Sequence, residues 1–235
     1  MNESLPVVSV RAAAGPVKSV VLVLHGGAEQ SRAPVPPWKL AYLRMVPIAA
    51  AIHRDGREHG VEVRLLRNRV YGWNGEGQDA LADARWALDR IREDHPGVRI
   101  VLVGHSMGGR VGLRVADDPA VVAVAALAPW TPEGEPVDAV AGRSVLIAHG
   151  TQDHMTDPAG SYSFALRAEP VATRVVRYEI DREGHAMLRR AGVWTRLVRE
   201  FTREFTREFT RDAVADRPPA AAETKPDAER LRIPV

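Results

Sequence analysis

The sequence contains no cysteine among its 235 residues. That absence excludes disulfide bonds, thiolate metal sites and a cysteine nucleophile. The chain also lacks an excess of charge of either sign, with 32 basic against 30 acidic residues. Proteins that bind nucleic acid usually carry a concentrated basic stripe, so a nucleic-acid partner is not expected.

Long hydrophobic runs are missing as well, since stretches such as 20–24 and 119–129 are far shorter than a membrane span requires. Residues 1–18 show no basic start followed by an apolar core, so we expect no signal peptide and a cytoplasmic location. The length suits one domain, which we place over residues 1–211. Residues 212–235 are rich in proline, alanine and charge, and this tail is expected to be disordered.

What the chain does have is an alternation of short β-branched runs and helical patterns. This alternation is typical of an α/β fold, with a mostly parallel sheet covered by helices on both faces. Strands are predicted over 19–24, 61–66, 99–103, 121–127, 144–148 and 173–180, with a weak first strand over 7–11. Helices are predicted over 78–93, 107–116 and 160–168, and over 38–59 with a kink or break at Pro47.

Near the end, the tetrapeptide Arg-Glu-Phe-Thr occurs three times in succession over 199–210. On a helix this period keeps Phe201, Phe205 and Phe209 on one slowly rotating stripe. The stripe is expected to lengthen the last helix of the domain. The alternative is that it contacts a second copy of the chain and forms a homodimer.

The strongest chemical signal is the sequence Gly-His-Ser-Met-Gly over 104–108. A buried strand is predicted directly before it and a helix directly after it. A serine on so tight a strand-to-helix turn needs small neighbours, because its backbone is strained and another chain segment passes close by. The turn exposes the hydroxyl of Ser106 and aims the first N–H groups of the helix at a substrate oxygen. Ser106 is therefore predicted to be a nucleophile.

A serine hydroxyl needs a base, and an imidazole base is best held by a carboxylate. His185 lies between the strand at 173–180 and the last helix, where a loop could return it to Ser106. Asp153 follows the strand at 144–148, at the same edge of the predicted sheet. Asp157 is the second choice for the acid, although a helix cap explains it better. A third and poorer choice is the group Glu133, Glu135 and Asp138.

Two other histidines fall in these segments. His105 is expected to pack against the serine turn or support it. The set His149, Asp153, His154 and Asp157 could be read as metal ligands, but Gly150 and Pro158 bracket a loop, so the spacing does not place them on one helical face. Neither a metal nor a cofactor is expected.

An acyl-transfer site needs two donors for the oxygen that becomes negative in the intermediate. The N–H of Met107 comes from the serine turn. The second donor is expected in the sequence His-Gly-Gly-Ala over 25–28, which follows the strand at 19–24. We choose the N–H of Gly27 over that of Ala28.

Taken together, these segments resemble the α/β-hydrolase family. The resemblance covers about residues 17–202 and rests on four pieces in the family's order, which are 25–27, the Ser106 turn, 149–153 and 184–185. It implies the family's twisted, mostly parallel sheet and its serine chemistry. The implied roles are Ser106 as nucleophile, Asp153 as acid, His185 as base, and Gly27 and Met107 as oxyanion donors.

The chain departs from many members of that family, because only about thirteen residues separate Trp130 from Ser144, where a helical lid is often inserted. A minimal or absent lid implies an open pocket that suits small or flexible esters. Trp38, Trp73 and Trp130 lie in loops near predicted strand ends and are candidates for binding the substrate, with surface packing as the alternative.

The leading functional prediction is a serine hydrolase that cleaves a carboxylic ester of a small-molecule acyl substrate through an acyl-enzyme. A thioesterase, lactonase or peptidase would use the same residues. The alternative from a different class is a non-catalytic protein that uses this fold to bind a ligand.

Overall fold

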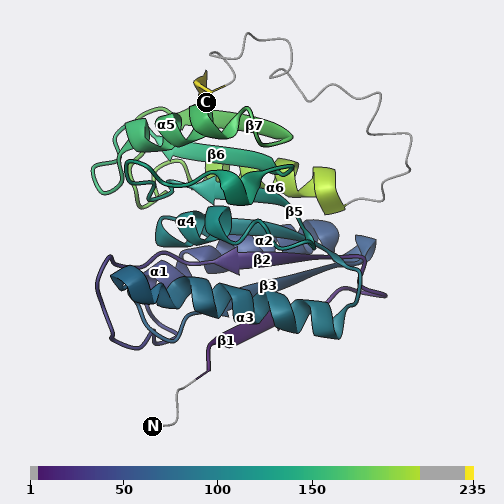
Figure 1. Cartoon of the computed structure of the whole chain (residues 1–235). Helices are drawn as coiled ribbons and strands as arrows, with labels where there is room; N and C mark the ends of the chain where they lie inside the picture. Colours follow the sequence, from purple (N-terminus) through teal and green to yellow (C-terminus); the bar gives the residue numbers. More distant parts are fainter. Residues whose placement is uncertain (1–4, 207–230) are drawn as a thin grey trace.

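The computed structural model describes residues 5–206 and 231–235, and in this part of the chain one sheet is formed (Figure 1). Its strand order is β1-β3-β2-β4-β5-β6-β7-β8. The strands are β1 (Val7–Arg11), β2 (Ser19–Leu24), β3 (Val61–Arg67), β4 (Arg99–His105), β5 (Val121–Leu127), β6 (Ser144–Gly150), β7 (Arg174–Ile180) and β8 (Ile233–Pro234). β1 runs antiparallel to β3, and every other pairing is parallel.

Helices cover both faces of this sheet. They are α1 (Leu40–Leu43), α2 (Met45–Gly56), α3 (Asp79–Asp94), α4 (Met107–Arg114), α5 (Pro158–Ala168) and α6 (Ala191–Thr206), with short 3₁₀ turns η1 (Arg57–His59), η2 (Gly75–Gly77) and η3 (Asp138–Val140). One hydrophobic cluster joins α3, α4 and α5 to the sheet, and a second joins α2 and α6 to it. The predicted α/β architecture is confirmed.

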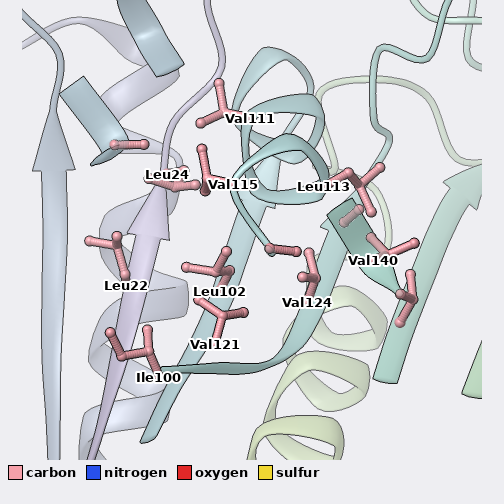
Figure 2. Packing of buried hydrophobic residues seen from close by; sticks show 14 of the residues in the cluster. Leu22, Leu24, Ile100, Leu102, Val111, Leu113, Val115, Val121, Val124 and Val140 are labelled. Carbon is pink, nitrogen blue, oxygen red and sulfur yellow. The ribbon is translucent and has the colours of Figure 1, made fainter. Parts of the chain in front are cut away.

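The alternation of side chains along the strands divides the core between the two faces. In β2, Leu22 and Leu24 belong to the cluster under α3 and α4, whereas Val21 and Val23 belong to the cluster under α2 and α6. All six residues of β2 are buried, as expected for a central parallel strand covered on both sides. Figure 2 shows Leu22 and Leu24 beside the side chains of β4, β5 and α4 in the first cluster.

The connection between β5 and β6 is short and contains the single 3₁₀ turn η3. The fold therefore has no helical lid at this point, as predicted. No helix of the described residues has both the length and the apolar character that crossing a bilayer requires.

The helical region at 38–59 is divided next to Pro47, as predicted. Arg44 separates α1 from α2, while Pro47 lies inside the first turn of α2. Pro47 has no N–H to donate to the carbonyl of Leu43, four residues earlier, and its ring crowds that carbonyl. The first helix therefore ends at Leu43, and Pro47 lies in the first turn of the next helix, where a missing N–H is tolerated.

The end of the chain also differs from the prediction. Most of the tail over 212–235 lies outside the described residues, but its last five residues are ordered. Ile233 and Pro234 pair in parallel with Tyr178 and Glu179 of β7, and Leu231 is fully buried. The prediction of disorder is wrong for residues 231–235, because this short segment contributes a strand and a core side chain.

Within the described residues, the phenylalanine stripe packs against other parts of the same chain. Phe201 on α6 is buried in the second cluster, and its ring lies 5.1 Å from that of Phe205. Arg199 and Arg203 reach across to Asp55 on α2, at 2.6 and 2.7 Å. Phe209 and the third repeat lie outside the described residues.

Candidate active site

Ser106 sits between the end of β4 and the first residue of α4, in a strained conformation with φ 55° and ψ −118°. A residue with a side chain rarely adopts a positive φ. Three backbone hydrogen bonds hold this one there. The Ser106 N–H donates to the carbonyl of Leu127 at 2.9 Å, and the Ser106 carbonyl accepts from the N–H groups of Arg110 and Trp130 at 3.1 and 3.2 Å.

The glycines around Ser106 are required by close approach of the backbone. A Cβ at Gly104 would lie 2.1 Å from the carbonyl oxygen of Gly108, and a Cβ at Gly108 would lie 2.5 Å from that of Leu24. Both distances are shorter than atoms tolerate. The Gly-His-Ser-Met-Gly pattern is therefore a steric requirement of this turn.

The three residues predicted from the sequence as a triad lie in hydrogen-bond contact. The Nε2 of His185 is 2.9 Å from the Oγ of Ser106, and the Nδ1 of His185 is 2.8 Å from the Oδ2 of Asp153. Ser106 follows β4, Asp153 follows β6, and His185 follows β7. The carboxyl ends of parallel strands meet at one edge of the sheet, which brings together residues 32 and 79 positions apart.

Asp153 is enclosed by hydrogen-bond donors. Its Oδ1 accepts from the N–H groups of Met155 and Thr156 at 2.8 and 3.0 Å, and its Oδ2 accepts from the hydroxyl of Thr156 at 2.9 Å. Burial alone would raise the pKa of the Asp153 carboxyl. Hydrogen bonds from His149, His185 and Thr156 outweigh burial and hold that pKa well below its ordinary range.

The other candidate acids have different partners. Asp157 caps α5, accepting a hydrogen bond from the N–H of Ala159 at 2.8 Å. Glu135 is buried and pairs with Arg110 at 2.7 Å, while Glu133 is exposed and Asp138 opens η3. Of these acids, the structure brings Asp153 to His185.

The predicted oxyanion donors flank the serine. A Cβ built at Gly26 would lie 3.3 Å from the Cβ of Ser106, so this loop passes directly over the serine turn. The Ala28 N–H donates to the carbonyl of Tyr71 at 3.0 Å and is therefore engaged. Among the described residues, no hydrogen-bond acceptor contacts the Gly27 N–H. The N–H of Met107, as the first residue of α4, has no partner within that helix.

Two buried histidines support these turns. The Nε2–H of His105 donates to the carbonyl of His185 at 2.9 Å, and burial lowers the pKa of His105 to about 3. His25 accepts from the N–H of Asn68 at 3.1 Å, and burial lowers its pKa to about 4. Both rings are neutral at pH 7. The role of His105 agrees with the sequence prediction of support, although its partner 80 positions away could not be read from the sequence.

The three candidate tryptophans have different environments. Trp38 is 73% exposed, Trp73 is buried and Trp130 is half-buried. The rings of Trp73 and Trp130 meet edge to face at 6.0 Å. The guanidinium of Arg110 lies 3.9 and 4.4 Å from their centroids. Sequence reasoning missed Arg110, whose position four residues after Ser106 on the helix was the available signal.

The sequence offers His149, Asp153, His154 and Asp157 as a possible set of metal ligands. Within residues 5–206 and 231–235, no group of three or more histidine, aspartate or glutamate side chains is arranged to hold a metal ion. His149 and Asp153 instead contact each other at 3.2 Å.

Comparison with known proteins adds a family and a fold. Residues 15–143 match the family model described as serine aminopeptidase, S33, a range that contains Ser106 but neither Asp153 nor His185. No curated protein matches the chain.

Several solved structures share the fold at low identity. An α/β serine hydrolase without a lid from Xanthomonas campestris is 18% identical, with a TM-score of 0.64 over 87% of this chain and 91% of that one. Est1E from Butyrivibrio proteoclasticus with bound ferulic acid is 17% identical, with a TM-score of 0.64 over 85% and 94%. A monoacylglycerol lipase from Paleococcus ferrophilus is 15% identical, with a TM-score of 0.61 over 84% and 98%. With more than half of its residues matched by the family model, the chain belongs to the serine aminopeptidase, S33, family of α/β-hydrolases.

Proposed function

We propose that this protein is a serine hydrolase that cleaves carboxylic esters through an acyl-enzyme. The observation that carries the proposal is the continuous path from the Oγ of Ser106 through the ring of His185 to Asp153, with contacts of 2.9 and 2.8 Å. The proposed nucleophile Ser106 has an imidazole base beside it, and the base His185 has a carboxylate beside it.

In the first step His185 accepts the proton of the Ser106 hydroxyl on Nε2 while the Oγ attacks the carbonyl carbon of the ester. The carbonyl oxygen becomes negative and is stabilised by the N–H groups of Gly27 and Met107. His185 then gives its proton to the leaving alcohol. A water molecule repeats the sequence on the acyl-enzyme, releasing the carboxylic acid and restoring Ser106. Asp153 stabilises the imidazolium of His185 throughout.

The pairing of the buried carboxylates near the site favours esters over peptides. An aminopeptidase must bind the free ammonium group of its substrate, which calls for an available carboxylate. In the loops after β5 to β7, Glu135 is paired with Arg110, Asp153 is enclosed by donors, and Glu183 accepts from the N–H of Arg190 at 2.6 Å. The missing lid favours small or flexible acyl groups. The fold relatives with bound ferulic acid and with lipase activity in their names are compatible with ester substrates.

The test is a panel of p-nitrophenyl esters, thioesters and aminoacyl amides, together with labelling by a fluorophosphonate. We expect the wild-type protein to hydrolyse the esters best and to be labelled. Ser106→Ala should lose at least about 10³-fold in kcat and should not be labelled. Ser163→Ala, which removes an exposed hydroxyl on α5, is the matched control and should behave like the wild type. Labelling of Ser106→Ala would refute the assignment of the nucleophile.

A further inference from the structure

Asp153 contacts two histidines through the same oxygen. Its Oδ2 lies 2.8 Å from the Nδ1 of His185 and 3.2 Å from the Nε2 of His149, the next-to-last residue of β6. Both the His149 ring and the Asp153 carboxylate are fully buried. The reaction proposed above uses His185 and assigns no role to His149.

The other ring nitrogen of His149 also has a partner. Its Nδ1 lies 2.8 Å from the Oγ of Ser161 on α5, and the Nε of Arg177 donates to this same oxygen at 3.2 Å. A guanidinium can only donate, so Ser161 accepts from Arg177 and keeps its own hydrogen to donate. The Ser161 hydroxyl also lies 3.0 Å from the carbonyl of Pro158, to which it can donate, and that carbonyl accepts a second hydrogen bond from the Nη2 of Arg177 at 3.0 Å.

This arrangement determines where the hydrogen of His149 sits. The Nε2 of His149 faces two oxygens that can only accept, the Oδ2 of Asp153 and the carbonyl of Thr156, each at 3.2 Å. Nε2 therefore carries the hydrogen, and Nδ1 is left to accept from Ser161. Arg177 is itself buried and fixed, because its Nη1 donates to Glu179 at 2.6 Å and to the carbonyl of Leu231 at 3.0 Å. The chain of hydrogen bonds thus begins at the C-terminal segment and ends at Asp153.

We propose that His149 is a positioning residue for Asp153, with its hydrogen held on Nε2 by the two acceptors that face this nitrogen. The proposal rests on the proposed role of Asp153 as the acid of the hydrolase. Donation from His149 keeps the carboxylate from rotating and offsets part of its negative charge. The orientation and the charge that Asp153 presents to His185 therefore depend on a residue that never contacts substrate.

The charged and titratable groups that face this pair come from several elements. His105 at the end of β4 lies with its ring 4.8 Å from that of His185, and it stays neutral because burial lowers its pKa to about 3. Arg44, between α1 and α2, acts electrostatically on His105. On the other side Asp153 faces His149. The hydroxyl of Thr156 also donates to Asp153 at 2.9 Å, but it lies 3.1 Å from the Nδ1 of His185 as well. His149 is therefore the donor whose substitution leaves the contacts of the base unchanged.

The first test compares His149→Leu with His149→Gln. We expect His149→Leu to lower kcat about tenfold, the factor that corresponds to one lost hydrogen bond, with KM unchanged. The acid limb of the kcat/KM profile should move upward, because a less neutralised Asp153 stabilises the imidazolium of His185 more strongly. His149→Gln can donate to Asp153 and accept from Ser161, and should recover most of both effects. His59→Gln, at an exposed histidine, is the control.

The second test removes the group that contacts the other ring nitrogen of His149. Ser161→Ala should lower kcat about threefold and move the acid limb in the same direction, because the His149 ring loses its contact at Nδ1 and is then less firmly oriented toward Asp153. Ser163→Ala makes the same change at an exposed position of the same helix and should match the wild type.

The outcomes separate the two proposals. Wild-type activity that depends on Ser106, together with equal kcat and equal pH profiles for all His149 and Ser161 variants, would overturn the positioning role alone. An unchanged acid limb with a loss of activity that follows the loss of folded protein, measured by circular dichroism, would also overturn it. Absence of esterase activity and labelling in the wild type would instead count against the proposed function.

Discussion

At the scale of the residue, the buried histidines His25 and His105 couple folding to pH. Their pKa values are lowered by burial from 6.5 to about 4 and about 3. Between pH 6.5 and those values the unfolded chain binds protons that the folded chain does not. The free energy of unfolding must therefore fall as the pH falls through this window.

We expect each of these histidines to lower the free energy of unfolding by up to about 2 kcal/mol between pH 7 and pH 5. The measurement is urea unfolding at several pH values. His25→Gln should remove about half of the pH dependence that the two histidines produce, whereas His59→Gln at an exposed site should leave it unchanged. A flat free energy of unfolding over this range would contradict the assignment of neutral buried rings.

The chemical roles of single residues could be predicted from the sequence where a short motif or the end of a strand identifies them. Ser106 stands in a pattern that its own turn requires, and His185 and Asp153 follow strands whose ends share one edge, so their meeting was predicted and is observed. The partners of His149, Ser161 and Arg177 could not be predicted in this way. Their contacts depend on how α5 and the chain end pack against β6 and β7, which spacing along the chain does not report.

At the scale of the element, the loop over 25–28 is fitted to the serine turn at atomic distances. A Cβ at Gly27 would lie 2.4 Å from both the carbonyl oxygen of Tyr71 and the Cε of Met107. Such contacts force the loop to move, and its N–H groups move with it away from the substrate oxygen.

Gly27→Ala is therefore expected to lower kcat by about 10²–10³-fold, the effect of losing one oxyanion donor, with a smaller change in KM. The matched control is Gly192→Ala near the start of α6, where a Cβ meets nothing within 4 Å. The control should keep full activity and gain up to about 1 kcal/mol in the free energy of unfolding. Steady-state kinetics and urea unfolding check both variants, and full activity of Gly27→Ala would exclude Gly27 as a donor.

Strands were easier to predict than helix boundaries. A parallel strand covered on both faces is a continuous apolar run, and β2 and β5 have the predicted bounds for that reason. The division of the region at 38–59 could be predicted from Pro47, but its position at Arg44, three residues before the proline, could not. β8 is a two-residue strand, too short for a periodic pattern, and its position depends on the burial of Leu231.

At the scale of the whole molecule, the C-terminal segment closes one edge of the sheet while β1 forms the other (Figure 1). Leu231 belongs to the same cluster as the side chains under α5, so the chain end helps to bury the core. The segment also supplies the carbonyl that holds Arg177.

Leu231→Ala should lower the free energy of unfolding by about 2–5 kcal/mol, as for other buried leucines. Ile233→Ala, at a half-buried position in the same segment, should cost less. Thermal unfolding followed by circular dichroism distinguishes these outcomes. A melting temperature of Leu231→Ala equal to that of the wild type would show that the chain end contributes nothing to the core.

The strained backbone of Ser106 lowers the stability of the fold, and the proposed activity depends on it. A φ of 55° with a ψ of −118° suits glycine and strains any residue that has a side chain. Stability alone would therefore favour glycine at this position, whereas the proposed reaction requires serine. A lineage that drifted under selection for stability, without selection for hydrolysis, would tend to replace this serine first, and such a descendant would keep the fold while losing the reaction.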